Sequence, residues 1–213
     1  MEVPVDGYVI DLVRSDRTNG ELLVEFQTGG FSALRRKLPA LLERHAVHLV
    51  TPVAVARHIL KVDPSGELLS QRRSPKRGRV EDIFAELVSI PALLSHPRFT
   101  LEVVLVELEE IRVHGTARAF RRRGWVVTGR ALRKVLERVA VSTEAHALAL
   151  LPSGLPDTFT TAEIAASGAL PRRLAQQMAY CLLALGCIER VSKRGNAHCY
   201  QRVVAPSSLD HWL

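Results

Sequence analysis

Two β-rich segments joined by a tight-turn sequence constrain the fold of this chain more than any other feature. Residues 8–14 and 21–28 are rich in apolar residues, and Asn19-Gly20 between them is a strong hairpin signal. Apolar residues at helical spacing follow over residues 32–45, and a third β-rich run covers residues 48–54. This order predicts an α/β fold in which the second and third strands are parallel, because a helical crossover separates them.

The rest of the chain suggests two domains. Residues 80–94 and 128–139 have apolar residues at helical spacing, whereas residues 100–113 alternate as a strand does. The character of the sequence changes after the Pro- and Gly-containing stretch 151–156. We therefore predict an α/β domain with a mixed sheet and flanking helices over residues 1–139, and a smaller domain over residues 140–213.

Composition narrows the class of protein. The chain has 213 residues, of which 47% are hydrophobic and 24% are charged, so global disorder is not expected. Three cysteines, an odd number in a chain able to bury a core, point to a reducing compartment. No apolar run reaches the roughly 18 residues of a membrane span, and the first residues lack a signal-peptide pattern. We expect a cytoplasmic protein with no membrane partner.

Net charge suggests the kind of partner. The formal charge is +7, from 29 Lys and Arg against 22 Asp and Glu. Such an excess favours a polyanion such as DNA, because each neutralised phosphate releases condensed counterions. The alternative is a basic protein encoded by a genome rich in arginine codons.

Asp11 and Glu25 are the residues best suited to carry chemistry. They lie near the middle of the first two predicted strands, among apolar neighbours that make an unpaired carboxylate costly to bury. Two carboxylates, a backbone carbonyl and waters suit Mg²⁺, which prefers oxygen ligands. Gln27 leaves the same face of its strand as Glu25, and Lys37 on the next helix could reach back toward them. Alternatively, Asp11 and Glu25 face solvent on a one-sided sheet.

Residues 7–54 resemble the core of the PD-(D/E)XK nuclease superfamily, which has the restriction-endonuclease-like fold. The matching residues are Ile10-Asp11 on one strand and Glu25-Phe26-Gln27 on the next, followed by a helix and a strand. The resemblance implies a restriction-endonuclease-like mixed sheet in which Asp11 and Glu25 hold Mg²⁺, with Mn²⁺ as a substitute. It implies an enzyme that hydrolyses DNA phosphodiesters with a metal-activated water. No small-molecule cofactor is expected, and nucleases of this fold often work as homodimers.

Two departures from the family pattern bear on activity. The family usually has lysine where Gln27 stands, and glutamine cannot supply a positive charge to the nucleophile. Some members tolerate glutamine there, and in others the lysine has moved to the following helix, which would make Lys37 the substitute. Many members also have an N-terminal helix with an additional glutamate. Here either the chain is truncated, or Glu2 takes that role, or the helix is dispensable. A nuclease-fold protein that binds DNA without cleaving it is the rival interpretation.

The C-terminal part resembles a winged-helix DNA-binding domain. A helix near residues 143–151, a capping-box pattern at residues 160–163, a longer helix after Pro171 and a hairpin around residues 193–196 carry the resemblance. On the longer helix, four polar side chains could enter a major groove, namely Arg172, Arg173, Gln176 and Gln177. Lys193 and Arg194 at the wing would contact phosphate. The alternative is that the winged helix binds another protein.

Two basic clusters are further candidates for contacts with DNA phosphates. They consist of Arg72, Arg73, Lys76, Arg77 and Arg79, and of Arg121, Arg122 and Arg123. Both could equally be solvated loops, which is the commoner meaning of a charge run. A zinc site at Cys181, Cys187, His198 and Cys199 is disfavoured, because the spacing lacks a C-x2-C knuckle.

Overall fold

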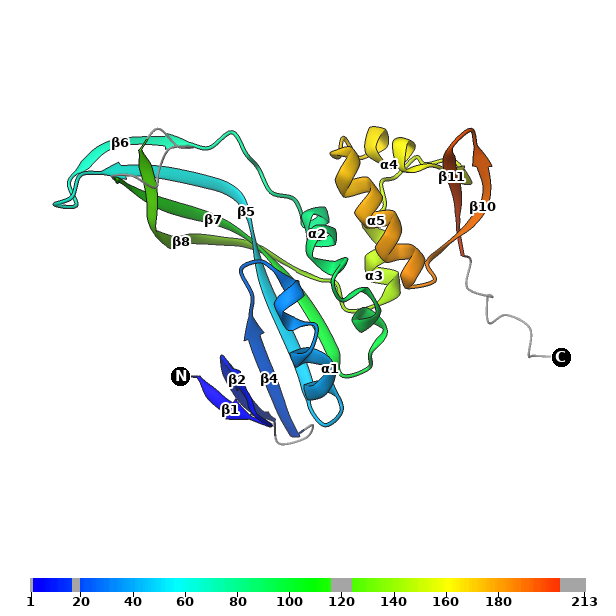
Figure 1. Ribbon diagram of the computed structural model, residues 1–213, viewed down its shortest axis with the longest axis horizontal. Coiled ribbons are helices and arrows are strands. Elements are labelled where there is room, and N and C mark those ends of the chain that lie inside the picture. The colour runs from blue at the N-terminus through cyan, green and yellow to red at the C-terminus, as the bar shows by residue number, and fades with distance from the viewer. Residues whose placement is uncertain (1, 17–19, 116–123, 204–213) are drawn as a thin grey trace.

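A computed structural model describes residues 2–16, 20–115 and 124–203 of the chain (Figure 1). A six-stranded mixed sheet has the order β3-β4-β5-β7-β8, with β6 paired to the far end of β5. A C-terminal unit contains three helices and the three-stranded sheet β10-β11-β9. The predicted α/β class is confirmed. Within the described residues, no helix is both long enough and apolar enough to cross a membrane.

The first strands form two short hairpins rather than one. β1 (Val3–Val5) pairs with β2 (Tyr8–Ile10) through a tight turn in which Asp6 and Gly7 have φ of 47° and 81°. β3 (Leu12–Asp16) pairs with β4 (Gly20–Phe26) in the antiparallel hairpin predicted from the sequence. The predicted strand over residues 8–14 is thus divided.

The crossover after β4 leads to a parallel strand, as predicted. It contains the 3-10 helix η1 (Phe31–Leu34) and the α-helix α1 (Lys37–Leu42) instead of one helix over residues 32–45. β5 (Ala46–Val62) then pairs in parallel with β4 and with β7 (Phe99–His114). The strand predicted at residues 48–54 is therefore only the first part of a 17-residue strand.

The helix predicted over residues 128–139 is wrong. This segment belongs to β8 (Trp125–Ala140), which is antiparallel to β7. Its register shifts three times along β7, and each shift interrupts the alternation that identifies a strand in sequence. Pairing with β7 therefore overrides the helical spacing of the apolar residues in this segment.

The connection from β5 to β7 contains one strand and three short helices, and the helices pack on one face of the sheet. It begins with β6 (Leu68–Arg73), which occupies part of the predicted basic loop. The helix predicted over residues 80–94 is divided into three short helices: η2 (Val80–Ile83), α2 (Phe84–Leu87) and η3 (Pro91–Ser95). Leu101 and Val103 of β7 are fully buried beneath these helices.

The three helices and the hairpin of the C-terminal unit occur in the predicted order, whereas the short strand β9 was not predicted. The elements of this unit are α3 (Glu144–Ala149), β9 (Thr158–Phe159), α4 (Thr161–Ser167), α5 (Arg172–Ala184), β10 (Ile188–Arg194) and β11 (Ala197–Arg202). The predicted capping box is present, because Thr160 and Glu163 bond each other's backbone N–H. Gly186, with φ of 70°, follows Leu185, the C-cap residue of α5, and this is the position where a glycine in the left-handed conformation is common.

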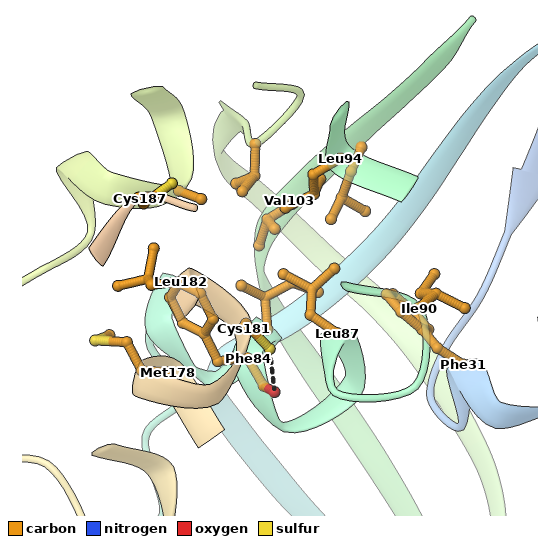
Figure 2. Close-up of a cluster of buried hydrophobic side chains, with 14 of the residues drawn as sticks. Phe31, Phe84, Leu87, Ile90, Leu94, Val103, Met178, Cys181, Leu182 and Cys187 are labelled. Carbon is orange, nitrogen blue, oxygen red and sulfur yellow. Dashed lines mark hydrogen bonds between the residues drawn. The ribbon is translucent and has the colours of Figure 1, made fainter. Parts of the chain in front are cut away.

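A continuous hydrophobic core joins the sheet to the C-terminal unit. Phe84 and Leu87 of α2 meet Met178, Cys181 and Leu182 of α5 (Figure 2). The Cys181 thiol donates to the Phe84 carbonyl at 3.9 Å, and all of these side chains are almost completely buried. Because the core is shared, the two parts stabilise each other.

Replacing Phe84 by alanine should therefore destabilise both parts together. Phe84 is fully buried, and Phe→Ala changes in cores lower the free energy of unfolding by about 3–5 kcal/mol. Urea unfolding followed by Trp fluorescence and by helical circular dichroism should show one transition at a lower midpoint. Leu69→Ala on β6, where the side chain is 58% exposed, is the control and should change the midpoint little. Two separate transitions in the Phe84→Ala protein would contradict the shared core.

Candidate active site and nucleic-acid interface

Glu25 and Lys37 form an ion pair beneath the first helix. Alternation along β4 directs Glu25 and Leu23 to the helix-covered face, while Val24 and Phe26 face the other way. Lys37 is the first residue of α1, and its Nζ lies 2.7 Å from Glu25 Oε1. The same Nζ donates to the carbonyl of Val9 at 2.6 Å. Lys37 therefore reaches back to Glu25, as the sequence analysis suggested.

The second oxygen of Glu25 has no hydrogen-bond partner among the described residues. Glu25 is 8% exposed, and its Oε2 is buried. An unsatisfied carboxylate oxygen raises the free energy of the folded state. This atom is consequently a good acceptor for a cation or a proton donor.

Asp11 lies at the same end of β4, between β2 and β3. Its Oδ2 accepts a hydrogen bond from the Phe26 backbone N–H at 2.7 Å. Leu12 is the first residue of β3 paired with β4, so the Asp11 side chain extends the ladder where backbone pairing has ended. One Asp11 oxygen therefore has a structural role.

Gln27 is directed into the loop that follows β4. Its Nε2 donates to the carbonyl of Gly29 and, at 3.5 Å, to that of Gly30. The backbone of Gln27 is also fixed, since its N–H donates to Val50 O at 2.9 Å and its carbonyl accepts from Thr51 Oγ1 at 2.7 Å. The structure thus brings Lys37, and not the Gln27 amide, to Glu25.

The donor chemistry at Asp11 and Glu25 suits a hard divalent cation. Mg²⁺ is usually held by one or two carboxylates and keeps several waters. Glu25 Oε2 and the Asp11 carboxylate are oxygen donors of that kind. Among the described residues, no group of three or more His, Cys, Asp and Glu side chains could hold a metal ion. Any site here would therefore depend on these two carboxylates, and Lys37 would compete with the cation for Glu25.

The C-terminal unit exposes most of its predicted DNA contacts. Arg172, Arg173 and Gln176 are exposed on the first turns of α5, and Gln177 is half-buried. Tyr180 is 54% exposed and follows Gln176 and Gln177 at helical spacing, so it extends the same face. Tyr180 is not among the predicted DNA contacts, although its helical spacing from Gln176 and Gln177 is visible in the sequence.

The two wing residues differ in their contacts. Lys193 is exposed. Arg194 Nη1 lies 2.8 Å from Glu163 Oε1, which joins the wing to the start of α4. The hydrogen bond from Arg194 holds the pKa of Glu163 below its usual value, with a smaller contribution from Thr160.

The first predicted basic cluster is spread over a strand and a loop. Arg72 and Arg73 are exposed neighbours on β6, so they point to opposite faces of the sheet. Lys76 lines a cavity of about 160 Å³ between β5 and α2, and Arg77 is exposed. Arg79 Nη1 donates to the carbonyls of Gly168 and Ala169, which ties this loop to the C-terminal unit. Arg121, Arg122 and Arg123 lie outside the described residues.

The cysteines show no sign of metal or thiol chemistry. Cys181, Cys187 and Cys199 are free thiols, and all three are buried. Burial raises the pKa of the Cys181 thiol to about 12 and, together with Glu144, raises that of Cys187. These thiols behave as small apolar core residues.

Sequence reasoning missed a cluster of arginines around Glu110 on β7. Glu110 is 3% exposed and lies 2.5 Å from Arg112, 3.8 Å from Arg57 and 3.7 Å from Arg130. Burial opposes ionisation of Glu110, but the hydrogen bond from Arg112 and the charges of Arg57 and Arg130 hold its pKa below the usual value. These residues come from three strands, so no local sequence pattern reveals the cluster.

Comparison with known proteins gives a family. Residues 1–142 match the family described as Domain of unknown function (DUF8091). The chain belongs to this family. The matched region ends two residues after β8, so it covers the sheet and its helices and leaves the C-terminal unit outside. A protein of Treponema pallidum (strain Nichols), described as uncharacterized, is 28% identical over 207 residues, which are 94% of this chain and 78% of the relative. No solved structure matches the chain.

Removing Lys37 should destabilise the fold by leaving Glu25 unpaired. Breaking a buried ion pair from one side costs about 3 kcal/mol or more, because the remaining charge stays desolvated. We expect Lys37→Met to lower the free energy of unfolding by about that amount in urea titrations at pH 7. Glu25→Gln combined with Lys37→Met should recover part of the loss, since the buried charge is then absent. A double variant as unstable as the two single losses added together would contradict this coupling.

Glu110 should make folding stability depend on pH. A carboxyl whose pKa is lowered by folding contributes stability above its unfolded value, near 4.5, and loses that contribution as the pH falls through the folded value. Glu110→Gln should therefore lower the free energy of unfolding by about 2 kcal/mol at pH 7, allowing for solvent at the exposed arginines. The difference from wild type should shrink toward pH 3 in urea titrations. A difference that stays constant from pH 7 to pH 3 would contradict the role of the Glu110 charge.

Proposed function

We propose that this protein is a Mg²⁺-dependent enzyme that hydrolyses DNA phosphodiesters. The observation that carries the proposal is the grouping of Asp11, Glu25 and Lys37 at one end of β4, with Glu25 Oε2 buried and unpartnered. Two carboxylates and one ammonium group are a minimal set for metal-assisted hydrolysis of a phosphodiester. The resemblance of residues 7–54 to the PD-(D/E)XK nucleases supports the same assignment of residues.

The proposed roles follow from the contacts of each residue. Asp11 and Glu25 would hold Mg²⁺, which supplies a bound water of lowered pKa and neutralises charge on the scissile phosphate. The Lys37 ammonium, held by Val9 O, would contact a non-bridging phosphate oxygen or orient the attacking water. Hydrogen bonds of Gln27 to Val50, Thr51 and Gly29 fix the backbone that directly follows Glu25 and Phe26.

The C-terminal unit would position the enzyme on DNA. Its sequence of helix, short strand, two helices and hairpin, with β9 added to β11, is the order expected of a winged helix. The exposed side chains Arg172, Arg173, Gln176 and Tyr180 of α5 would enter the major groove, and Lys193 would contact a phosphate. The net charge of +7 supports a polyanionic partner.

A second candidate function is DNA binding without cleavage. Asp11 has one oxygen on Phe26 N, Glu25 has one oxygen on Lys37, and the Gln27 amide donates to the Gly29 loop. These contacts give each residue of the site a structural role. They favour a nuclease-like scaffold that holds DNA and performs no hydrolysis.

Cleavage assays with matched variants test the two functions. With Mg²⁺ or Mn²⁺ and a labelled DNA duplex, Asp11→Asn and Glu25→Gln should lower the cleavage rate by about 100-fold or more. Glu21→Gln, an exposed carboxylate on the same strand, is the control and should cleave like wild type. Equal rates in all four proteins, or cleavage that persists in EDTA, would contradict the catalytic assignment. DNA binding without any cleavage by wild type would support the second candidate.

A further inference from the structure

Strands β5, β6, β7 and β8 form an arm that extends away from the helices (Figure 1). Residues directly opposite each other in a ladder share a face of the sheet. One rung of the arm contains Arg72, Ile59, Glu110 and Arg130 in register across the four strands. We call the face that carries this rung, and that continues to Val24 and Phe26, the open face. Glu25 lies on the opposite, helix-covered face.

Charge is distributed unequally between the two faces of the arm. On the open face of these four strands, the basic side chains outnumber the acidic ones: Arg57, Lys61, Arg72, Arg112, Arg130 and Arg138 against Glu102 and Glu110. On the other face the numbers are equal: Arg73, Arg133 and Lys134 against Glu107, Glu109 and Glu137. The open face therefore carries the net positive charge of these four strands.

The two carboxylates of the open face neutralise only part of its positive charge, so the rest can bind an anionic ligand. Glu110 is shared by Arg57, Arg112 and Arg130, and Arg130 is still 58% exposed. Glu102 is shared by His48, at 3.2 Å, and Arg138, at 3.4 Å, and Arg138 is 71% exposed. Arg130 and Arg138 are thus held in place by partial pairing, while most of each side chain is exposed to solvent. They suit phosphate oxygens.

An apolar groove of about 490 Å³ continues the open face toward β3. Its floor contains Val24, Val50, Val104 and Val106, and its rim contains Arg14 and Arg138. Phe26 lines the groove with 53% of its surface exposed, and Leu132 of β8 is 60% exposed. An exposed aromatic ring in an apolar groove that arginines also line suits the stacking of bases and the neutralisation of phosphates.

We propose that the open face binds single-stranded DNA, with bases against Phe26 and the apolar groove and phosphates along Arg130 and Arg138. A duplex presents sugars and phosphates and keeps its bases stacked inside, so it would leave the apolar floor unmatched. An unpaired strand offers both a charged backbone and flat apolar bases. This inference deepens the proposed function and rests on it, because the proposed function is the reason to choose DNA over other polyanions as the ligand. The strand would lie on the face of the sheet opposite to Glu25 and Lys37.

Two pairs of variants on one strand test the surface. Arg130→Ala and Arg138→Ala remove charge from the open face, and Arg133→Ala and Lys134→Ala remove the same charge from the other face of β8. Binding of fluorescent oligo(dT) is measured by anisotropy in EDTA over a range of salt concentrations, so cleavage does not enter the readout. Arg130→Ala and Arg138→Ala should each weaken binding about five-fold and lower the salt slope by about 0.7. Arg133→Ala and Lys134→Ala should bind like wild type.

Further binding measurements distinguish single-stranded DNA from duplex DNA and from RNA as the ligand. Phe26→Ala should weaken oligo(dT) binding about five-fold or more through lost stacking, with little change in salt slope. Excess unlabelled duplex of the same length should compete less well than oligo(dT), and oligo(U) shows whether RNA replaces DNA. Equal losses in both pairs of variants, equal or better competition by duplex or by oligo(U), or no effect of Phe26→Ala would each overturn the proposal. Failure here with intact metal-dependent cleavage would leave the proposed function standing, because the two readouts are separate.

Discussion

Backbone hydrogen bonding along β5 positions the candidate functional residues on both faces of the sheet. The first residues of β5 pair with β4, almost its whole length pairs with β7, and its far end pairs with β6. Pairing with β4 places Glu25 opposite Leu49, where α1 can bring Lys37 to it. Further along, the same strand presents Arg57 and Lys61 to the other face. A slip of one residue in this register would exchange the two faces and destroy both arrangements.

Local signals in the sequence predicted the parts of the fold that local interactions determine. The Thr160 capping box, the glycine after α5 and the hairpin of β3 and β4 all depend on neighbouring residues, and all are present. The Glu25–Lys37 contact was also accessible, because it joins a strand to the next helix. The strand β8 could not be predicted in this way. Helical spacing is satisfied by four of its apolar residues, Leu132, Val135, Leu136 and Val139, and the three register shifts obscure the alternation typical of a strand. Pairing with β7, a long-range interaction, decides its structure.

The arginines of the open face show why much of a binding surface cannot be read from sequence. Arg57, Arg72, Arg112 and Arg130 are distant in the chain and occur on four strands. They share a face only because the registers of three ladders agree. The basic run beginning at Arg72 is more visible in the sequence, yet the structure divides it between two faces, and Arg79 contacts the protein itself. Clustering in space and clustering in sequence are therefore different properties of this chain.

The contact of α2 with α5 has a mechanical consequence. Phe84, Cys181 and Leu182 are packed without solvent between them, and Arg79 fastens a loop of the sheet domain to the turn after α4. The C-terminal unit is thus packed directly against the helices of the sheet domain, and the described contacts fix its orientation. In the proposed nuclease, this packing would hold α5 at a fixed distance from Glu25, so DNA bound by α5 would always approach the same edge of the sheet.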